Sequence, residues 1–408
     1  MEYIAREIER KILKLNKVFK AILLTGARQV GKTTTLKKLA EESKRAYVSM
    51  DNHQDRELAQ RDPKLFFQTY KPPILIDEVQ KAPELFEAIK EICDASEERG
   101  LFWLTGSESV RLLKNAGDSL AGRICILRMY SFSQREKTMR AQVGEFPFSF
   151  QALRERRTIF GENNINDVFE HIWRGGMPQV QNMDEEELRE YFSSYVDTYL
   201  LRDAVDDNGI NDTSGFKKVL IACAAFVGCL VNYSDLATAG GVSVPTAKSW
   251  IKILENMGII YLLEPYSHNR LKHLVKTPKL YFCDTGLAAF LSQLSNKEVL
   301  QNGAAAGKFF ENYVVGEFLR TFSYGPSKAN LSYYRDSNQK EIKLIIEADG
   351  IIHPVEIKKA TSVNERSIKA FAILKNANLE VGEGLVACMT DRVYPIDGGN
   401  FMVPCNVI

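Results

Sequence analysis

Residues 26–34, GARQVGKTT, constrain the fold of this chain more than any other stretch. They follow a short apolar run, AILLT at 21–25, and precede a segment with helical spacing. Two glycines five positions apart, followed by Lys32 and Thr33, are typical of a loop whose N–H groups point at phosphate oxygens at the start of a helix. The nucleotide-binding residues that this loop predicts are Gly26, Ala27, Arg28, Gln29, Val30, Gly31, Lys32, Thr33 and Thr34.

The chemistry of this loop predicts a nucleoside triphosphate with Mg²⁺ as the ligand. The Lys32 amine would reach the β- and γ-phosphates, and the Thr33 hydroxyl would bind the metal ion. The loop residues contact only phosphates, so they do not indicate which base is bound.

Short apolar runs alternate with helix-like segments over the first part of the chain. The runs lie at 21–25, 46–50, 73–77, 101–105 and 124–128. This alternation predicts an α/β fold, with a parallel sheet that carries helices on both faces. We expect this domain to occupy residues 1–145.

The run PILIDEVQ ends in two acids, Asp77 and Glu78. Acids at the carboxyl end of a parallel strand face the crevice in which ligands bind. Asp77 is therefore a candidate for holding Mg²⁺ through a water, and Glu78 for polarising the attacking water. The alternative interpretation is a surface Asp-Glu pair that closes a strand.

Three further side chains are candidates for a role at the nucleotide, two of them in the same site and one in the site of a neighbouring subunit. Thr105 and Ser107 follow the next strand and could sense the γ-phosphate. Arg123 lies between a helix and the fifth strand. It either completes the site of a neighbouring subunit as an arginine finger or interacts with the carbonyl groups at the end of the helix.

The stretches LLTGARQVGKTT, LIDEVQKAPELF, LTGSES, SLAGR and YSFSQRE resemble a large family of bacterial and archaeal ATP-binding proteins of the AAA+ superfamily. The resemblance implies that the nucleotide is ATP. It also implies an extra strand between the strand of the phosphate loop and the acidic strand.

The resemblance continues through HIWRGGMPQV and YVDTYLLRDAV, which are similar to the helical segment that follows the ATPase core of that family. We expect this segment at residues 146–215. Within it, Arg202 either reaches bound nucleotide as a second sensor or pairs with Asp206 on the surface of a helix.

Residues 216–292 predict a winged helix. Ser234 is expected to cap a short helix, and Ser243 a second helix that is followed by a β-run. Thr246, Ser249, Lys252 and the basic stretch 266–279 could lie along DNA. The alternative is a module that packs within the protein or docks another protein.

Residues 305–408 predict a helix, three strands, a helix and a strand, an order similar to restriction-endonuclease-like domains. Such enzymes hold Mg²⁺ between acids, with a lysine steadying the attacking water. The candidate residues here are Glu311, Glu341, Lys343, Glu356 and Lys358.

In that family an aspartate of the middle strand binds the metal, and Lys343 stands at its position. Exchanging an anion for a cation about 5 Å from a divalent ion changes their interaction by several kcal/mol. Glu341 lies on the same face of the strand but roughly 6.6 Å along it. We therefore expect a nuclease-like scaffold without cleavage activity.

The composition limits the location and the partners. The net charge of the 408 residues is +1, which predicts no general affinity for polyanions, and the seven cysteines are scattered, which fits a reducing cytoplasm. The longest apolar run, 219–231, is shorter than the roughly 20 residues of a membrane span. The expected partners are ATP and ADP, with DNA, another protein or a second copy of the chain as further candidates.

These patterns together predict a Mg²⁺-dependent ATPase whose nucleotide state moves the helical segment, the winged helix and the nuclease-like domain. One alternative is a nucleotide-gated DNA-binding or protein-docking switch with negligible turnover. Another is an ATP-regulated nuclease.

Overall fold

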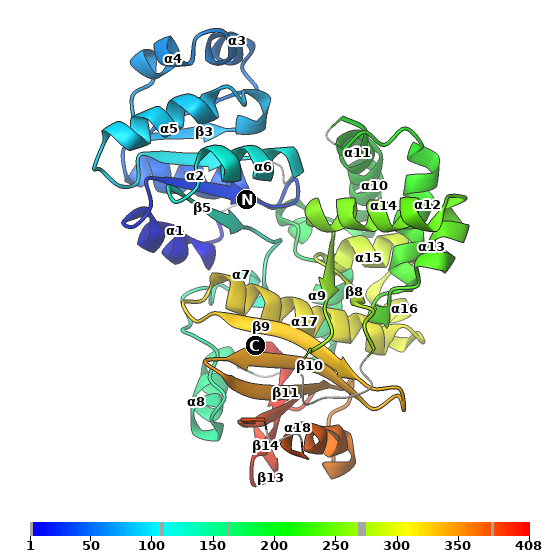
Figure 1. The fold of residues 1–408 in the computed structure, drawn as a ribbon. Coiled ribbons are helices and arrows are strands. Elements are labelled where there is room, and N and C mark those ends of the chain that lie inside the picture. Colours follow the sequence, from blue (N-terminus) through cyan, green and yellow to red (C-terminus); the bar gives the residue numbers. More distant parts are fainter. Residues whose placement is uncertain (1–2, 107–109, 162–163, 207, 268–274, 377–378) are drawn as a thin grey trace.

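The computed structural model describes residues 3–106, 110–161, 164–206, 208–267, 275–376 and 379–408 (Figure 1). Ser107 and the middle of the basic stretch 266–279 lie outside the described residues. None of the helices in these six ranges has the length and the apolar character of a membrane span.

The N-terminal domain is built on a parallel sheet with the strand order β2-β3-β4-β1-β5. Strand β4 lies between β1, which leads into the phosphate loop, and β3, which ends in Asp77, as the family resemblance implies. The α/β prediction is confirmed. The strands are β1 Ala21–Thr25, β2 Ala46–Ser49, β3 Ile74–Asp77, β4 Phe102–Thr105 and β5 Ile124–Arg128.

Both faces of this sheet are covered. Successive side chains of a strand point to opposite faces, and in β1 Ile22 and Leu24 enter one apolar cluster while Ala21 and Leu23 enter another. The strands are therefore apolar throughout, as is typical of parallel sheets. The helices of this domain are α1 Ile8–Asn16, α2 Lys32–Glu42, α3 His53–Arg61, α4 Pro63–Thr69, α5 Leu85–Ala95, α6 Val110–Ser119 and α7 Gln134–Lys137, with a short 3₁₀ helix at Val79–Lys81.

A helical region follows, in which a six-residue π-helix at Tyr195–Leu200 joins two α-helices. Its first helix, α8, packs against the C-terminal domain, where Arg156 Nε donates to Val407 O at 2.6 Å. The elements are α8 Phe150–Phe160, α9 Ile165–Arg174, a 3₁₀ helix Pro178–Asn182, α10 Glu185–Ser194 and α11 Leu201–Asp206.

The next unit combines helices with a three-stranded antiparallel sheet of order β6-β8-β7, whose first strand lies between α12 and α13. Its assignment as a winged helix stays a prediction, and we call residues 213–302 the winged-helix unit after that prediction. Ser243 caps α14 as predicted. The cap of α13 is Asn232 and not Ser234, because the Asn232 side chain reaches the free N–H groups of Ser234 and Asp235. The elements are α12 Thr213–Ala225, β6 Cys229–Leu230, α13 Tyr233–Gly240, α14 Val244–Asn256, β7 Ile260–Leu263, β8 Lys279–Phe282, α15 Thr285–Leu291 and α16 Lys297–Asn302.

The C-terminal domain packs the long helix α17 against a mixed sheet of order β13-β14-β12-β11-β10-β9. Asp349 and Gly350 join β10 to β11 with φ angles of 51° and 82°, which is the backbone of a tight hairpin turn. The elements are α17 Ala306–Tyr324, β9 Ala329–Arg335, β10 Glu341–Ala348, β11 Ile351–Ile357, a 3₁₀ helix Glu365–Phe371, α18 Ala372–Asn376, β12 Gly384–Cys388, β13 Tyr394–Asp397, β14 Asn400–Pro404 and a 3₁₀ helix Cys405–Val407.

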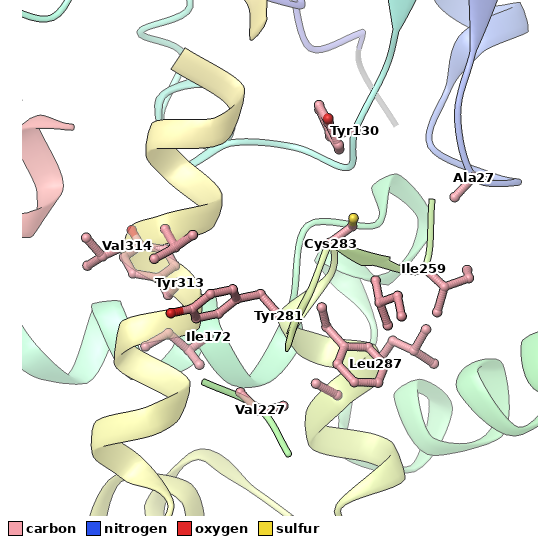
Figure 2. Close-up of a cluster of buried hydrophobic side chains, with 14 of the residues drawn as sticks. Ala27, Tyr130, Ile172, Val227, Ile259, Tyr281, Cys283, Leu287, Tyr313 and Val314 are labelled. Atoms are coloured by element: carbon pink, nitrogen blue, oxygen red, sulfur yellow. The ribbon is translucent and has the colours of Figure 1, made fainter. Parts of the chain in front are cut away.

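The four units contribute to one apolar core. Residues beyond β7 run beside β9, where Tyr266 N donates to Tyr333 O at 2.7 Å. Figure 2 shows part of the core, to which the phosphate loop, the helical region, the winged-helix unit and α17 all contribute. Its labelled residues are Ala27, Tyr130, Ile172, Val227, Ile259, Tyr281, Cys283, Leu287, Tyr313 and Val314.

Candidate active site

The backbone of the phosphate loop adopts conformations at two positions that favour glycine. Gly26 has a φ of 136°, and a Cβ added to it would lie 2.1 Å from Met129 O. Gly31, with a φ of 97°, directly precedes α2. The loop therefore curls at the positive end of a helix, where its N–H groups can bind an anion.

Lys32 lies inside this curl. Its side chain is buried, and Nζ donates to Gly26 O at 2.9 Å and to Ala27 O at 2.8 Å. The cation is thus held against the loop in which phosphates would bind. This position agrees with the role predicted for Lys32.

Asp77 is the centre of a hydrogen-bonded cluster at the carboxyl edge of the sheet. Thr33 Oγ1 donates to Asp77 Oδ1 at 2.7 Å, and the Thr105 hydroxyl donates to the same oxygen. Tyr47 OH donates to Asp77 Oδ2 at 3.2 Å. The structure therefore brings together three predicted residues, Thr33, Asp77 and Thr105, and adds Tyr47 from β2, which the sequence analysis missed.

Glu78 has an uncommon backbone. Its φ of 56° and ψ of 43° are left-handed, a conformation that is unfavourable for residues other than glycine and that clusters at functional sites. Its N–H donates to Thr105 Oγ1 at 3.2 Å, and its carboxylate accepts from the Gln80 amide. Glu78 lies beside the Asp77 cluster, and Gln80 is a second residue that the sequence analysis missed.

The far side of the phosphate loop is covered by the helical region and the winged-helix unit. Arg28 forms an ion pair with Asp203 on α11, and Gln29 accepts from Tyr191 OH. A Cβ added to Gly258 would lie 3.2 Å from Ala27 N. Two cavities of about 10 Å³ each border the loop on this side, so its packing is close.

Arg202, the predicted second sensor, lies exposed on α11, one position before Asp203. The alternative pairing involves Asp206, whose side chain lies outside those described. The structure therefore connects the phosphate loop to Asp203, the neighbour of the predicted residue Arg202. The spacing of residues in the sequence did not indicate that Asp203 makes this contact.

Arg6 holds the loop from a third direction, and it was not among the predicted site residues. Its Nη1 donates to Val30 O at 2.8 Å and its Nη2 to Tyr130 O at 2.7 Å. Its Nε pairs with Glu136 Oε1 at 3.0 Å. All three groups of the buried guanidinium are thus used in fixing the loop to the segment after β5.

Arg123 does not lie in the same site. It directly precedes β5, and because β5 runs parallel to β1, Arg123 is at the edge of the sheet opposite the phosphate loop. Its guanidinium pairs with Asp94 at the surface. A role as an arginine finger would therefore require a second copy of the chain.

The site that the sequence predicts to be nuclease-like contains two lysines between its acids. Lys343 Nζ lies 3.1 Å from Glu311 Oε2 and 2.9 Å from Glu341 Oε1. Lys279 Nζ pairs with Glu311 and lies 2.9 Å from Glu341 Oε1. Burial by itself would raise the pKa of Glu341, but Lys279 and Lys343 hold that pKa at about 2. Glu341 is therefore ionised, and both acids lie within ion-pair distance of the two lysines.

Lys279 corrects one prediction. As the last residue of the basic stretch 266–279 it was expected along DNA, but it is 1% exposed on β8 and lies in this ion-pair network. The cause is tertiary, because α17 and β10 place two glutamates around its ammonium group. The remaining acid, Glu356, lies 3.2 Å from Lys358 Nζ.

Burial raises the pKa of Glu356, and Lys358 and Lys343 oppose that rise. Within the described parts of the chain, no group of three or more His, Cys, Asp or Glu side chains is arranged to hold a metal ion. The absence of cleavage activity stays a prediction, and this arrangement agrees with it.

The outer face of α14 carries few cations. Ser249 and Lys252 are exposed there, and Lys252 lies 2.7 Å from Glu255 Oε2. Thr246 is half-buried and exchanges a hydrogen bond with Ser243. DNA binding by this unit stays a prediction.

Comparison with protein families assigns separate models to the three parts of the chain. Residues 18–138 match an AAA domain. Residues 165–298 and 306–408 match two domains of unknown function, DUF8612 and DUF4143.

Related proteins are found in several bacteria. The chain is 25% identical over 391 residues to uncharacterized proteins of Mycobacterium tuberculosis and Mycobacterium bovis, which covers 95% of this chain and 80% of each relative. It is 26% identical over 224 residues to an uncharacterized protein of Haemophilus influenzae, which covers 53% of this chain and 50% of that protein.

Two solved structures are similar in part. One is a Walker-type ATPase of Pyrococcus abyssi, with a TM-score of 0.43 and 16% identity over 71% of this chain and 96% of that chain. The other is a variant of RuvB from Thermotoga maritima, with a TM-score of 0.29 and 17% identity over 64% of this chain and 91% of that chain.

Proposed function

We propose that this chain, whose residues 18–138 form a P-loop ATPase domain of the AAA+ type, binds ATP with Mg²⁺ and hydrolyses it to ADP and phosphate. The observation that carries the proposal is the meeting of Thr33 and Asp77, whose oxygens lie 2.7 Å apart beside the phosphate loop. One comes from the helix after the loop and the other from the acidic strand.

These residues fit a magnesium ion. Mg²⁺ takes oxygen ligands and usually keeps several waters, and the Thr33 hydroxyl and the Asp77 carboxylate supply oxygens at one point. When bound, the ion would neutralise charge on the phosphates. Tyr47 and Thr105 would keep the Asp77 carboxylate in one orientation through their hydrogen bonds.

Glu78 would accept a proton from the attacking water and orient it toward the γ-phosphate. The left-handed backbone of Glu78 turns the chain away from the line of β3 directly after Asp77. Lys32 would bind the β- and γ-phosphates.

Hydrolysis would alter the contacts of the loop with the rest of the chain. Arg28 and Gln29 contact the helical region, and Ala27 lies against Gly258 beside β7. A change in loop shape would therefore act directly on the helical and winged-helix units.

The test compares the wild type with Glu78→Gln and Lys32→Ala. With ATP and Mg²⁺, we expect phosphate release by the wild type, and release lower by about 100-fold or more in Glu78→Gln. ATP should raise the melting temperature of both the wild type and Glu78→Gln, but not of Lys32→Ala. Equal release by wild type and Glu78→Gln would remove Glu78 from the mechanism.

A second candidate function is a nucleotide-gated switch with negligible turnover. The observation that favours it is the hydrogen bond from the Gln80 amide to the Glu78 carboxylate, because that bond engages the base proposed for hydrolysis. Under this alternative, Gln80→Ala should release phosphate several-fold faster than the wild type. An unchanged or slower rate would count against a switch held by Gln80.

A further inference from the structure

A cavity of about 470 Å³ lies between the ATPase domain and the C-terminal domain, away from the phosphate loop. Its walls come from α1, from residues 141–145 and from the end of α17 with the turn after it. The apolar side chains on these walls are Leu15, Ala141, Val143, Tyr324 and Pro326.

The charged side chains of this cavity are mainly cations. Two carboxylates, Glu7 and Glu145, face five cations, which gives a net charge of +3 (5 − 2). The five cations are Arg10, Lys11, Lys14, Arg135 and Lys328.

Both carboxylates already have partners. Glu7 pairs with Arg135 and accepts from Ser133, and Glu145 accepts from Ser327 N at 2.9 Å and from its hydroxyl at 2.7 Å. Among the residues that the structure describes, neither carboxylate forms an ion pair with a lysine of this cavity, and both negative charges are already included in the net charge of +3.

The other cations of the cavity have few polar partners. Lys11 Nζ donates to Ser323 O at 2.6 Å, and Arg10 Nη2 to Gln142 O at 2.9 Å. Among the residues that the structure describes, Lys14 and Lys328 have no ion-pair partner, and both are exposed. Burial is the main cause that lowers the pKa of Lys11, and the nearby charge of Lys328 lowers that pKa further.

We propose that this cavity binds a small organic anion, whose apolar body lies against Leu15 and Val143 and whose charged group lies between Lys14 and Lys328. An apolar cavity with a few convergent charged groups is the usual form of a small-molecule site. The charged group of the ligand offsets the positive charge of these two lysines, and the ligand joins two domains of the chain. The site is separate from the proposed ATP site.

The test uses anilinonaphthalenesulfonate, an aromatic anion that fluoresces when it binds, and its uncharged parent phenylnaphthylamine. Fluorescence titration of the full chain should show that the double variant Lys14→Glu with Lys328→Glu binds the sulfonate at least about tenfold more weakly than the wild type. The uncharged parent should bind the two proteins equally, because it forms no charge–charge interaction with Lys14 or Lys328. A melting temperature equal to that of the wild type checks the fold.

Two controls identify the site. The double variant Lys71→Glu with Lys369→Glu makes the same charge change at exposed positions elsewhere and should bind the sulfonate as the wild type does. Val143→Trp, which fills the proposed cavity, should abolish binding. Ala225→Trp, which fills an apolar groove of about 540 Å³ beside α12, should not.

The proposal is overturned if the wild type does not bind the sulfonate, or if Lys14→Glu with Lys328→Glu binds it with wild-type affinity. Binding that is lost in Ala225→Trp and kept in Val143→Trp would also overturn it, since the probe would then occupy the groove beside α12. None of these results depends on whether the protein hydrolyses ATP.

Discussion

The guanidinium of Arg28 in the phosphate loop forms an ion pair with the carboxylate of Asp203 on α11, although 175 positions separate the two residues. The pair ties the loop to the helical region. It also neutralises a cation directly beside the proposed phosphate site, so Asp203 lowers the positive potential that a triphosphate would encounter.

Asp203→Asn should therefore bind ATP more tightly than the wild type. Removing one negative charge near the phosphates should favour binding by about 1 kcal/mol, or roughly fivefold in Kd. Calorimetric titration at low and high salt measures the change, which should shrink as salt screens the charge. Asp197→Asn, which removes an exposed acid paired with Lys217, is the control. Weaker ATP binding by Asp203→Asn would instead mean that the ion pair holds the loop in its binding shape.

Glu7 should make the stability of the protein depend on pH near neutrality. Burial raises its pKa from the ordinary value of 4.5 to about 7, with Arg135 opposing the rise and Glu136 adding to it. The folded state thus takes up a proton at a higher pH than the unfolded chain does. Stability should increase as the pH falls from about 7 toward 4.5, by on the order of 1 to 3 kcal/mol.

Urea unfolding of the wild type and of Glu7→Gln at several pH values in this range tests the prediction. Glu7→Gln should lack the increase, since its side chain does not titrate. Glu91→Gln, at an exposed position, should keep the wild-type slope. Parallel pH profiles for wild type and Glu7→Gln would contradict the assignment.

The parts of the fold and site that the sequence predicts are those with local patterns. The glycines and Lys32 of the phosphate loop lie within nine residues, and Asp77 follows an apolar strand directly. Parallel strands place their carboxyl ends at one edge, so the meeting of Thr33, Asp77 and Thr105 follows from the element order.

The parts that the sequence does not predict are contacts between elements far apart in the chain. Arg6 reaches Val30 and Glu136, and Asp203 reaches Arg28, only after the domains have packed together. Lys279 illustrates the same limit, because the basic stretch around it suggested DNA binding while two distant glutamates bury it. Local spacing carries no information on such pairings.

Lys279→Met should destabilise the protein strongly. Lys279 is nearly fully buried, and its removal leaves Glu311 and Glu341 with a single lysine. Removing one partner of a buried ion pair typically costs about 3 to 5 kcal/mol, so we expect a loss of about 3 kcal/mol in the free energy of unfolding. Lys252→Met, whose lysine is exposed and pairs with Glu255, should lose less than about 1 kcal/mol. Equal losses would show that the network contributes little.

Replacing Lys343 by the aspartate that the family resemblance implies should not by itself create a nuclease. In Lys343→Asp, Lys279 would still pair with Glu311 and Glu341, so a cation would remain between the acids. We expect neither the wild type nor Lys343→Asp to cleave plasmid or single-stranded DNA with Mg²⁺ or Mn²⁺.

The double variant Lys279→Met with Lys343→Asp removes both lysines and leaves Arg335 paired with Glu341 Oε2 at 3.1 Å. Three carboxylates then face one another without a lysine between them, so this variant should bind Mn²⁺, which electron paramagnetic resonance can detect. If this variant also cuts DNA, adding Lys358→Ala should abolish the cutting while Mn²⁺ stays bound, since the lysine steadies the attacking water and not the metal. Cleavage by the wild type that disappears in Lys358→Ala would contradict the prediction, because it would require the ion pairs of Lys279 and Lys343 to open in solution and admit a metal.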